Sequence, residues 1–326
     1  MISKLVAIAS NTYTETIRQP IFSILLWTAA GLLTLNPAIA AFSLESGGDN
    51  KVMKDIALST LLLYGLLASV FSATSVITRE IESFTVLTVV SKPVSRPLFL
   101  VGKQLGVTAA IAVGFYFLSL VFLMASQHGV MESNADKHDM PVLVGATLTL
   151  LISLSAAVFG NYVYGWHFPT TMLAWAVPLG TVAFVIAQFF DKQWNAGVID
   201  VEEIGKTLQV GLAIVLIFLA VMVLTACAVA LSTRFSQVLT LVLCAGIFVL
   251  GLLSDYYFGL RADEGMVFQV VGALLPNFQY FWVGDALTQD QIVPFAQVAR
   301  VAAYAGLYTL GVLALGVAMF QTREVG

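Results

Sequence analysis

Charged side chains are scarce in this sequence. Only 10% of its 326 residues are Asp, Glu, Lys or Arg, whereas 59% are hydrophobic. Soluble domains carry about a quarter charged residues, and so few charges cannot cover a globule of this size with a water-compatible surface. The composition therefore argues against a soluble domain and predicts a membrane protein whose surface faces lipid.

Cysteine is also rare. The two cysteines, Cys227 and Cys244, both lie inside apolar segments, so small core residues are a better interpretation than a disulfide framework or a metal cage. The net charge is −4 and no run of basic residues is present, which argues against a nucleic-acid partner.

Catalytic and energy-coupling motifs are missing. The chain has no Gly-x-x-x-x-Gly-Lys loop for ATP and no His-Glu-x-x-His pair for zinc. Its apolar stretches contain essentially no Asp, Glu, Lys or Arg, the residues with which ion-coupled carriers bind and relay charge. We therefore expect no catalytic, metal or cofactor site in this chain, and any energy for transport must come from a partner.

Long apolar runs are what the sequence has in abundance. A helix needs roughly 20 mostly apolar residues to cross a bilayer. Eight stretches meet this requirement, at residues 21–42, 56–77, 98–126, 141–164, 171–190, 208–231, 238–256 and 301–320. We predict an all-α polytopic membrane protein that forms one transmembrane domain over residues 1–326, with about eight transmembrane helices.

The distribution of Lys and Arg predicts the orientation. Total cation counts on the two sides differ little, but the short loop at residues 79–103 concentrates four of them, Arg79, Lys92, Arg96 and Lys103. Cations beside helix ends favour the cytoplasmic side. We therefore expect a multi-pass protein of the inner, cytoplasmic membrane with both termini in the cytoplasm.

Two segments outside the spans have amphipathic character. Residues 1–18 place Ile2, Leu5, Ala9, Tyr13 and Ile17 at helical spacing, which predicts a helix in the membrane interface, with a frayed terminus as the alternative. Residues 258–299 include an apolar run that is interrupted by a proline and too short for a crossing. We predict a re-entrant or interfacial hairpin there, on the extracytoplasmic side.

The segment at residues 79–96 joins the second and third predicted spans. Its first half can form a helix with Ile81, Phe84 and Thr88 on one side, and Pro93 ends it. A short, charged cytoplasmic helix of this kind suits a contact with a soluble partner. An ordinary loop whose cations set the topology explains the residues equally well.

A family resemblance favours the contact. The run Arg79-Glu80-Ile81-Glu82, followed by Ser91-Lys92-Pro93-Val94-Ser95-Arg96-Pro97-Leu98-Phe99-Leu100-Val101-Gly102-Lys103, resembles ABC-2-type permeases, in particular those associated with multi-copper enzyme maturation. Residues 8–15, 274–278 and 320–324 resemble the interfacial helix, a motif before the last span and the cytoplasmic tail of that family. The resemblance touches both ends and the middle of the chain.

This resemblance implies a function and partners. The chain would be the permease subunit of an ATP-driven exporter, with a second permease copy, membrane lipid around it, and a separate ATP-binding subunit that holds ATP and Mg. The residues expected to contact that ATPase are Arg79, Glu80, Ile81, Glu82, Phe84, Ser91, Lys92, Pro93, Ser95 and Arg96. Because the family core has six spans, residues 141–190 would be an extra helix pair, which we expect at the periphery and away from the dimer seam.

Two other functions stay open on the sequence. A non-transporting scaffold or assembly factor would have the same spans, and a lipid-modifying enzyme would need a polar cluster at the membrane surface. The acidic residues of the extracytoplasmic loops are better read as solvated loop charge than as such a cluster. Nothing in the sequence identifies the transported substrate.

Overall fold

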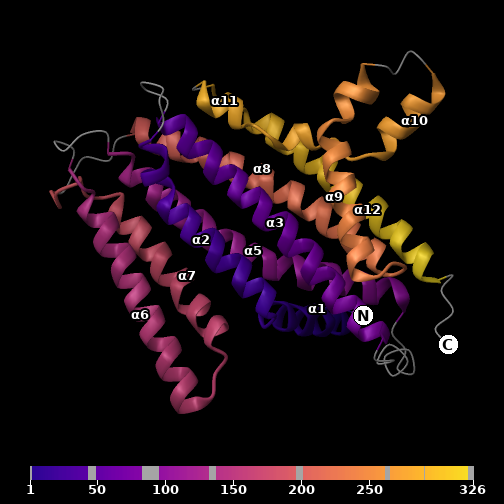
Figure 1. Cartoon of the computed structure of the whole chain (residues 1–326), viewed down its shortest axis with the longest axis horizontal. Coiled ribbons are helices and arrows are strands. Elements are labelled where there is room, and N and C mark those ends of the chain that lie inside the picture. The colour runs from indigo at the N-terminus through magenta and orange to yellow at the C-terminus, as the bar shows by residue number, and fades with distance from the viewer. Residues whose placement is uncertain are drawn as a thin grey trace.

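The computed structural model describes residues 2–42, 49–82, 95–131, 137–195, 201–260, 265–289 and 291–321. Within these ranges the regular structure is helical, and the long helices run side by side in a bundle (Figure 1). Helices suit a bilayer because they satisfy every backbone N–H and C=O group internally. The prediction of an all-helical polytopic membrane protein is confirmed.

Seven of the helices described are long and apolar enough to cross a membrane. The shortest, α7, has 20 residues, and a helix of that length spans the roughly 30 Å hydrocarbon core of a bilayer. The seven are α2 (Pro20–Ala40), α3 (Asp49–Glu82), α5 (Arg96–His128), α6 (Met140–Tyr164), α7 (Phe168–Ala187), α8 (Val201–Ser232) and α12 (Phe295–Gln321).

The stretch predicted as a span at residues 238–256 forms a shorter helix. Helix α9 (Gln237–Leu252) has 16 residues and is therefore about 24 Å long. A π-helical turn at Asp255–Gly259 follows it. The structure thus has seven long spans where the sequence predicts about eight, because the polar pair Ser254 and Asp255 interrupts the apolar run that the prediction treated as continuous.

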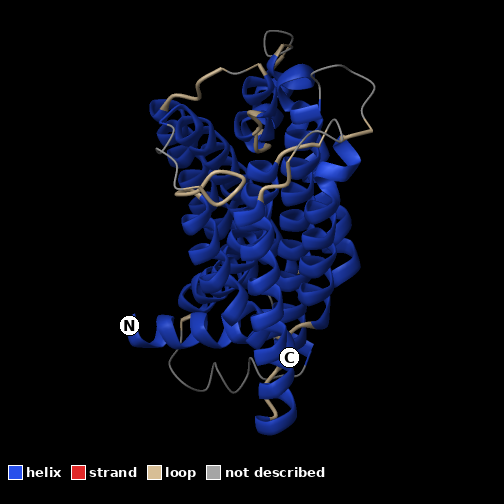
Figure 2. Ribbon diagram, turned by 90° about the vertical axis from the view of Figure 1, so that its left-hand side faces the viewer, coloured by secondary structure: helices blue, strands red, loops and turns tan. Residues whose placement is uncertain are grey.

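Helix α1 (Ile2–Ile17) covers most of the predicted interfacial segment 1–18. Pro20 stands at the first position of α2, where a proline begins a helix without losing a hydrogen bond. Figure 2 shows α1 lying across one end of the bundle, roughly at right angles to the long helices. We call this end of the bundle the α1 end and the other the opposite end.

Helix α8 is the centre of the packed core. In the 18-residue apolar stretch of this helix, 78% of the residues are buried. The helix packs against α3, α5 and α12. In contrast, only 17% of the residues are buried in the corresponding stretch of α6, and 28% in that of α7. Apolar side chains that remain exposed on spanning helices are suited to contact with lipid.

Helices α6 and α7 form an antiparallel pair at the edge of the bundle (Figure 1). They are joined by a short turn in which Gly165 has a φ of 67°, a left-handed conformation that glycine adopts at no steric cost. The pair contacts the rest of the chain chiefly through α5. Within one chain the pair predicted at residues 141–190 is therefore peripheral, and its position relative to a dimer seam stays a prediction.

Short helices fill the chain between α9 and α12. They are α10 (Met266–Leu274), a 3₁₀ turn at Phe278–Phe281 and α11 (Gly284–Thr288). The part around the 3₁₀ turn is fastened to neighbouring spans: the Tyr308 hydroxyl donates to the Leu274 carbonyl at 2.7 Å, and the Gln279 amide donates to the Leu252 carbonyl at 2.7 Å. This part of the predicted segment 258–299 therefore packs on the end of α9 and the middle of α12.

Candidate functional site

The described ends of the segment predicted to contact an ATPase are the end of α3 and the start of α5, and both lie at the α1 end (Figure 1). Helix α3 continues through Glu82, so it includes Arg79, Glu80, Ile81 and Glu82. Helix α5 begins at Arg96, with Ser95 as its N-cap residue. The remaining predicted contact residues fall outside the described part of the chain, and they are Phe84, Ser91, Lys92 and Pro93.

Arg96 joins the start of α5 to the end of α12. Its Nη1 donates to the carbonyls of Phe320 at 2.8 Å and Gln321 at 2.6 Å. The guanidinium also lies 5.5 Å from the centre of the Phe320 ring, and that ring stacks on Phe99 at 6.0 Å. The last carbonyls of a helix lack partners within it and attract cations. Arg96 therefore has a capping role that its sequence motif does not reveal.

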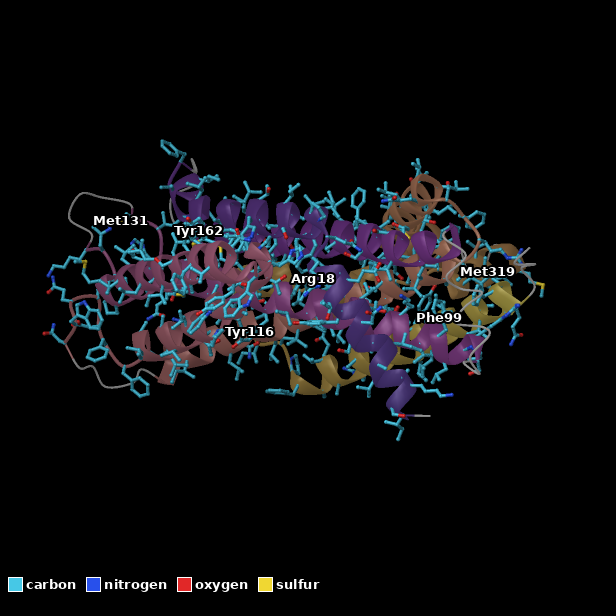
Figure 3. The ribbon with its side chains drawn as sticks, turned by 90° about the horizontal axis from the view of Figure 1, so that it is seen from below. Arg18, Phe99, Tyr116, Met131, Tyr162 and Met319 are labelled. Atoms are coloured by element: carbon cyan, nitrogen blue, oxygen red, sulfur yellow. The ribbon has the colours of Figure 1, made fainter. Side chains whose placement is uncertain are left out.

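A second arginine reaches the same helix end. Arg234, in the turn between α8 and α9, donates from Nε to the Met319 carbonyl at 2.9 Å. Figure 3 shows Phe99 and Met319 near each other toward one end of the molecule, with Met131 at the other. The end of α12 is therefore bound to two separate parts of the bundle.

Helix α1 packs directly on α5 through two glycines. A Cβ on Gly102 would lie 2.6 Å from Cγ2 of Ile8, and a Cβ on Gly106 would lie 2.5 Å from the Ala9 carbonyl oxygen. These distances are shorter than any real carbon contact, so only glycine permits this approach. Gly102, which belongs to the family-like motif, thus serves the packing of α1.

Lys103 carries a charge into the bundle. It belongs to the spanning helix α5, its side chain is only 1% exposed, and its Nζ lies 3.9 Å from the Glu15 carboxylate of α1. The ammonium also lies 5.5 Å from the centre of the Phe99 ring. A buried charge requires a partner, so this pair fixes α1 against α5. The expectation of essentially uncharged spans needs this correction.

A second feature, which we call the lateral groove, lies toward the opposite end. It has a volume of about 870 Å³ and is lined by α2, α5, α6 and α7. Helices α5 and α7 contact each other, and they lie between the groove's other two helices. No motif in the sequence predicts this groove, because it depends on how the α6–α7 pair is placed in space.

Polar contacts hold the helix pair against α5. The hydroxyls of Tyr116 and Thr181 are hydrogen-bonded at 3.1 Å. Nearer the opposite end, Gln127 donates to the Ala187 carbonyl at 3.2 Å and accepts a hydrogen bond from Gln188 at 2.8 Å. These contacts fix α7 to α5 at two levels and so set the width of the lateral groove.

Two histidines meet where the groove ends. His128 is the last residue of α5, and its ring centre lies 5.7 Å from that of His138, which precedes α6. Across the described ranges, no cluster of three or more His, Cys, Asp or Glu side chains is arranged to hold a metal ion. The sequence separates these histidines by ten positions and gives no spacing signal for their contact.

Comparison with known proteins adds no identification. No protein-family model matches the chain, and no curated protein gives a significant match.

Proposed function

We propose that the chain is the membrane-spanning permease subunit of an ATP-driven ABC-2-type transporter, acting as an exporter. A separate ATPase subunit binds residues 79–96, holds ATP and Mg, and supplies the energy. The observation that carries the proposal is the position of this segment. It joins two core helices, α3 and α5, at the end where α1 and the end of α12 also gather.

The packing of α5 supports a role in transmitting force. Helix α5 contacts α1, α2, α3, α7, α8 and α12. Its first residue, Arg96, is bound to α12, and Lys103 in its third turn is paired with α1. A displacement of residues 79–96 by the ATPase would therefore move α1 and α12 together with α5.

The proposed topology has eight crossings, with α9 as a short one. Helix α9 begins next to Arg234, which bonds the end of α12 at the α1 end. Helix α12 begins after α11, whose Leu287 carbonyl accepts from Lys54 near the start of α3 at 3.5 Å. The chain must return between these points, so we propose that α9 and the π-helical turn at Asp255–Gly259 make a short crossing. The core is then α2, α3, α5, α8, α9 and α12.

The proposal places the α1 end in the cytoplasm of a cell with an inner membrane. Arg96 and Arg234 lie there, as do the ends of the segment that contains Lys92, and cations concentrate on the cytoplasmic side of membrane proteins. Helix α1 would lie in the interface and the residues after α9 would form the extracytoplasmic hairpin. Two copies of the chain and two ATPase subunits would complete the transporter.

Affinity purification tests this function. A tagged chain, expressed in the cells that normally make it and extracted in mild detergent, should retain an ATP-hydrolysing subunit that mass spectrometry identifies. An unrelated tagged polytopic protein from the same membranes serves as the control for nonspecific recovery. If the chain is recovered without any ATPase under conditions that preserve its fold, the proposal is wrong and a scaffold function is favoured.

A further inference from the structure

The lateral groove has the size and chemistry of a binding site. Its volume of about 870 Å³ lies within the range of about 300–1,000 Å³ that is common for small-molecule pockets. Small side chains create the space, among them Gly31 and Ala38 on α2 and Ala146 on α6. A Cβ on Gly31 would have no atom within 4 Å, so this position opens directly into the groove.

The lining favours an alkyl chain over a polar ligand. Among the described residues that line it, none is Asp, Glu, Lys or Arg. Thr34 donates to the Ala30 carbonyl at 2.8 Å and Ser153 to the Thr149 carbonyl, so these hydroxyls are satisfied within their own helices. The rings of Trp27 and Phe117 meet edge to face at 5.3 Å and form an aromatic part of the wall. Such a surface offers dispersion and hydrophobic contact.

The groove also has the length of a lipid chain in one leaflet. Trp27 and Ala38 both line it, and a helix rises about 16.5 Å over the eleven positions that separate them. Half of a bilayer's hydrocarbon core is about 15 Å thick. Because the groove follows spanning helices, an acyl chain within it would lie roughly parallel to the acyl chains of the surrounding lipids.

The end of the groove at His128 has basic and hydrogen-bonding groups. Its lining includes His128, Gly129 and Met131. His128 donates from Nδ1 to the Gly129 carbonyl at 3.1 Å and lies beside the ring of His138. Lys137 and His138 are exposed. Imidazole N–H and ammonium groups can donate hydrogen bonds to phosphate oxygens.

Two of the described acids near this end, Asp139 and Asp191, already accept hydrogen bonds. Asp139 is buried and accepts a hydrogen bond at 3.1 Å from the backbone N–H of Val142 as the N-cap of α6. Hydrogen bonds from the side chain and backbone of Asn195, and from the backbone of Gln193, hold the pKa of Asp191 below its usual value. Because the charge of Lys137 also acts on Asp191, His128 and His138 are the groups that remain for an anionic headgroup.

We propose that the lateral groove binds one acyl chain of an anionic membrane phospholipid, with its phosphate at His128 and His138. The α6–α7 pair then forms one side of a lipid site that the core helices alone would not enclose. This inference does not rest on the proposed transport function, because lipid binding by the purified chain requires no ATPase.

Native mass spectrometry of the delipidated chain, reloaded from equal mixtures of phosphatidylglycerol and phosphatidylcholine, tests the site. The wild type should retain one phosphatidylglycerol strongly. Gly31→Phe places a ring in the groove and should reduce that retention at least tenfold. Gly306→Phe is the matched control, because Gly306 is also exposed on a spanning helix with no atom near its Cβ position, and it should retain the lipid.

A double variant separates the contribution of the lipid's acyl chain from that of its headgroup. His128→Ala/His138→Ala should keep one bound lipid but lose the preference for phosphatidylglycerol. If Gly31→Phe does not fold, Ala146→Phe fills the groove from α6 and should give the same loss. Equal lipid retention by wild type and groove-filled variants would overturn the proposal. The proposal would also be overturned if Gly31→Phe kept its lipid but no longer self-associated. The groove would then be a contact between two copies of the protein.

Discussion

Substituting Gly106 by leucine should displace α1 from the bundle. A Cβ at this position would lie 2.5 Å from the Ala9 carbonyl oxygen and 2.5 Å from Cβ of Thr12. A backbone atom cannot yield as a flexible side chain does, so the two helices must separate. Overpacking typically costs about 1–3 kcal/mol, and we expect the upper end of that range as a lowered apparent melting temperature.

A thiol at position 12 reports the displacement of α1. Thr12 is fully buried, and the native cysteines Cys227 and Cys244 are buried as well. Thr12→Cys should therefore resist a maleimide reagent in the wild-type background and react in Gly106→Leu. Gly311→Leu is the control, because a Cβ there has no atom within 4 Å. Continued protection of the thiol in Gly106→Leu, with unchanged stability, would show that α1 does not pack as described.

Replacing Glu80 and Phe84 together by alanine should abolish the interaction with the ATPase. Both belong to the segment whose acids and apolar face we propose to contact that subunit. Truncating a buried, paired charge at an interface costs about 2–5 kcal/mol, which weakens binding by about thirtyfold or more. Insertion and folding should be retained, because the apolar windows of α3 and α5 are unchanged.

Co-purification of the ATPase and chain-stimulated ATP turnover measure this effect. Asp255→Ala/Tyr256→Ala is the matched control, since it removes an acid and an aromatic ring that are exposed after α9. The control should bind and stimulate like the wild type. Normal partner binding and turnover in Glu80→Ala/Phe84→Ala would leave residues 79–96 as an ordinary loop whose cations set the topology.

The long spans were predictable because their signal is local. Roughly 20 continuous apolar residues have few alternatives to a spanning helix, and seven of the eight predicted stretches form one. The length of α9 was misjudged because the predicted stretch 238–256 runs past the polar pair Ser254 and Asp255. Such an interruption lowers the mean hydropathy of the stretch little, yet it ends α9 and begins a π-helical turn.

The functional detail was less predictable because it depends on tertiary contacts. Arg96 entered the prediction as a motif residue, while its hydrogen bonds reach carbonyls more than 220 positions away. Lys103 was counted among the loop cations, but its side chain is buried beside Glu15. The lateral groove depends on the distance between α2 and α6, which no periodicity in the sequence encodes.

Cysteine cross-linking at position 84 tests the central claim most directly. Cys227 and Cys244 are buried, so a new cysteine should be the reactive one. Phe84→Cys should cross-link to the ATPase subunit through a short bifunctional reagent, whereas Ile292→Cys, exposed before α12, should not. A cross-link from position 292 with none from position 84, or no cross-link to an ATPase from either, would contradict the assignment of residues 79–96 as the coupling contact.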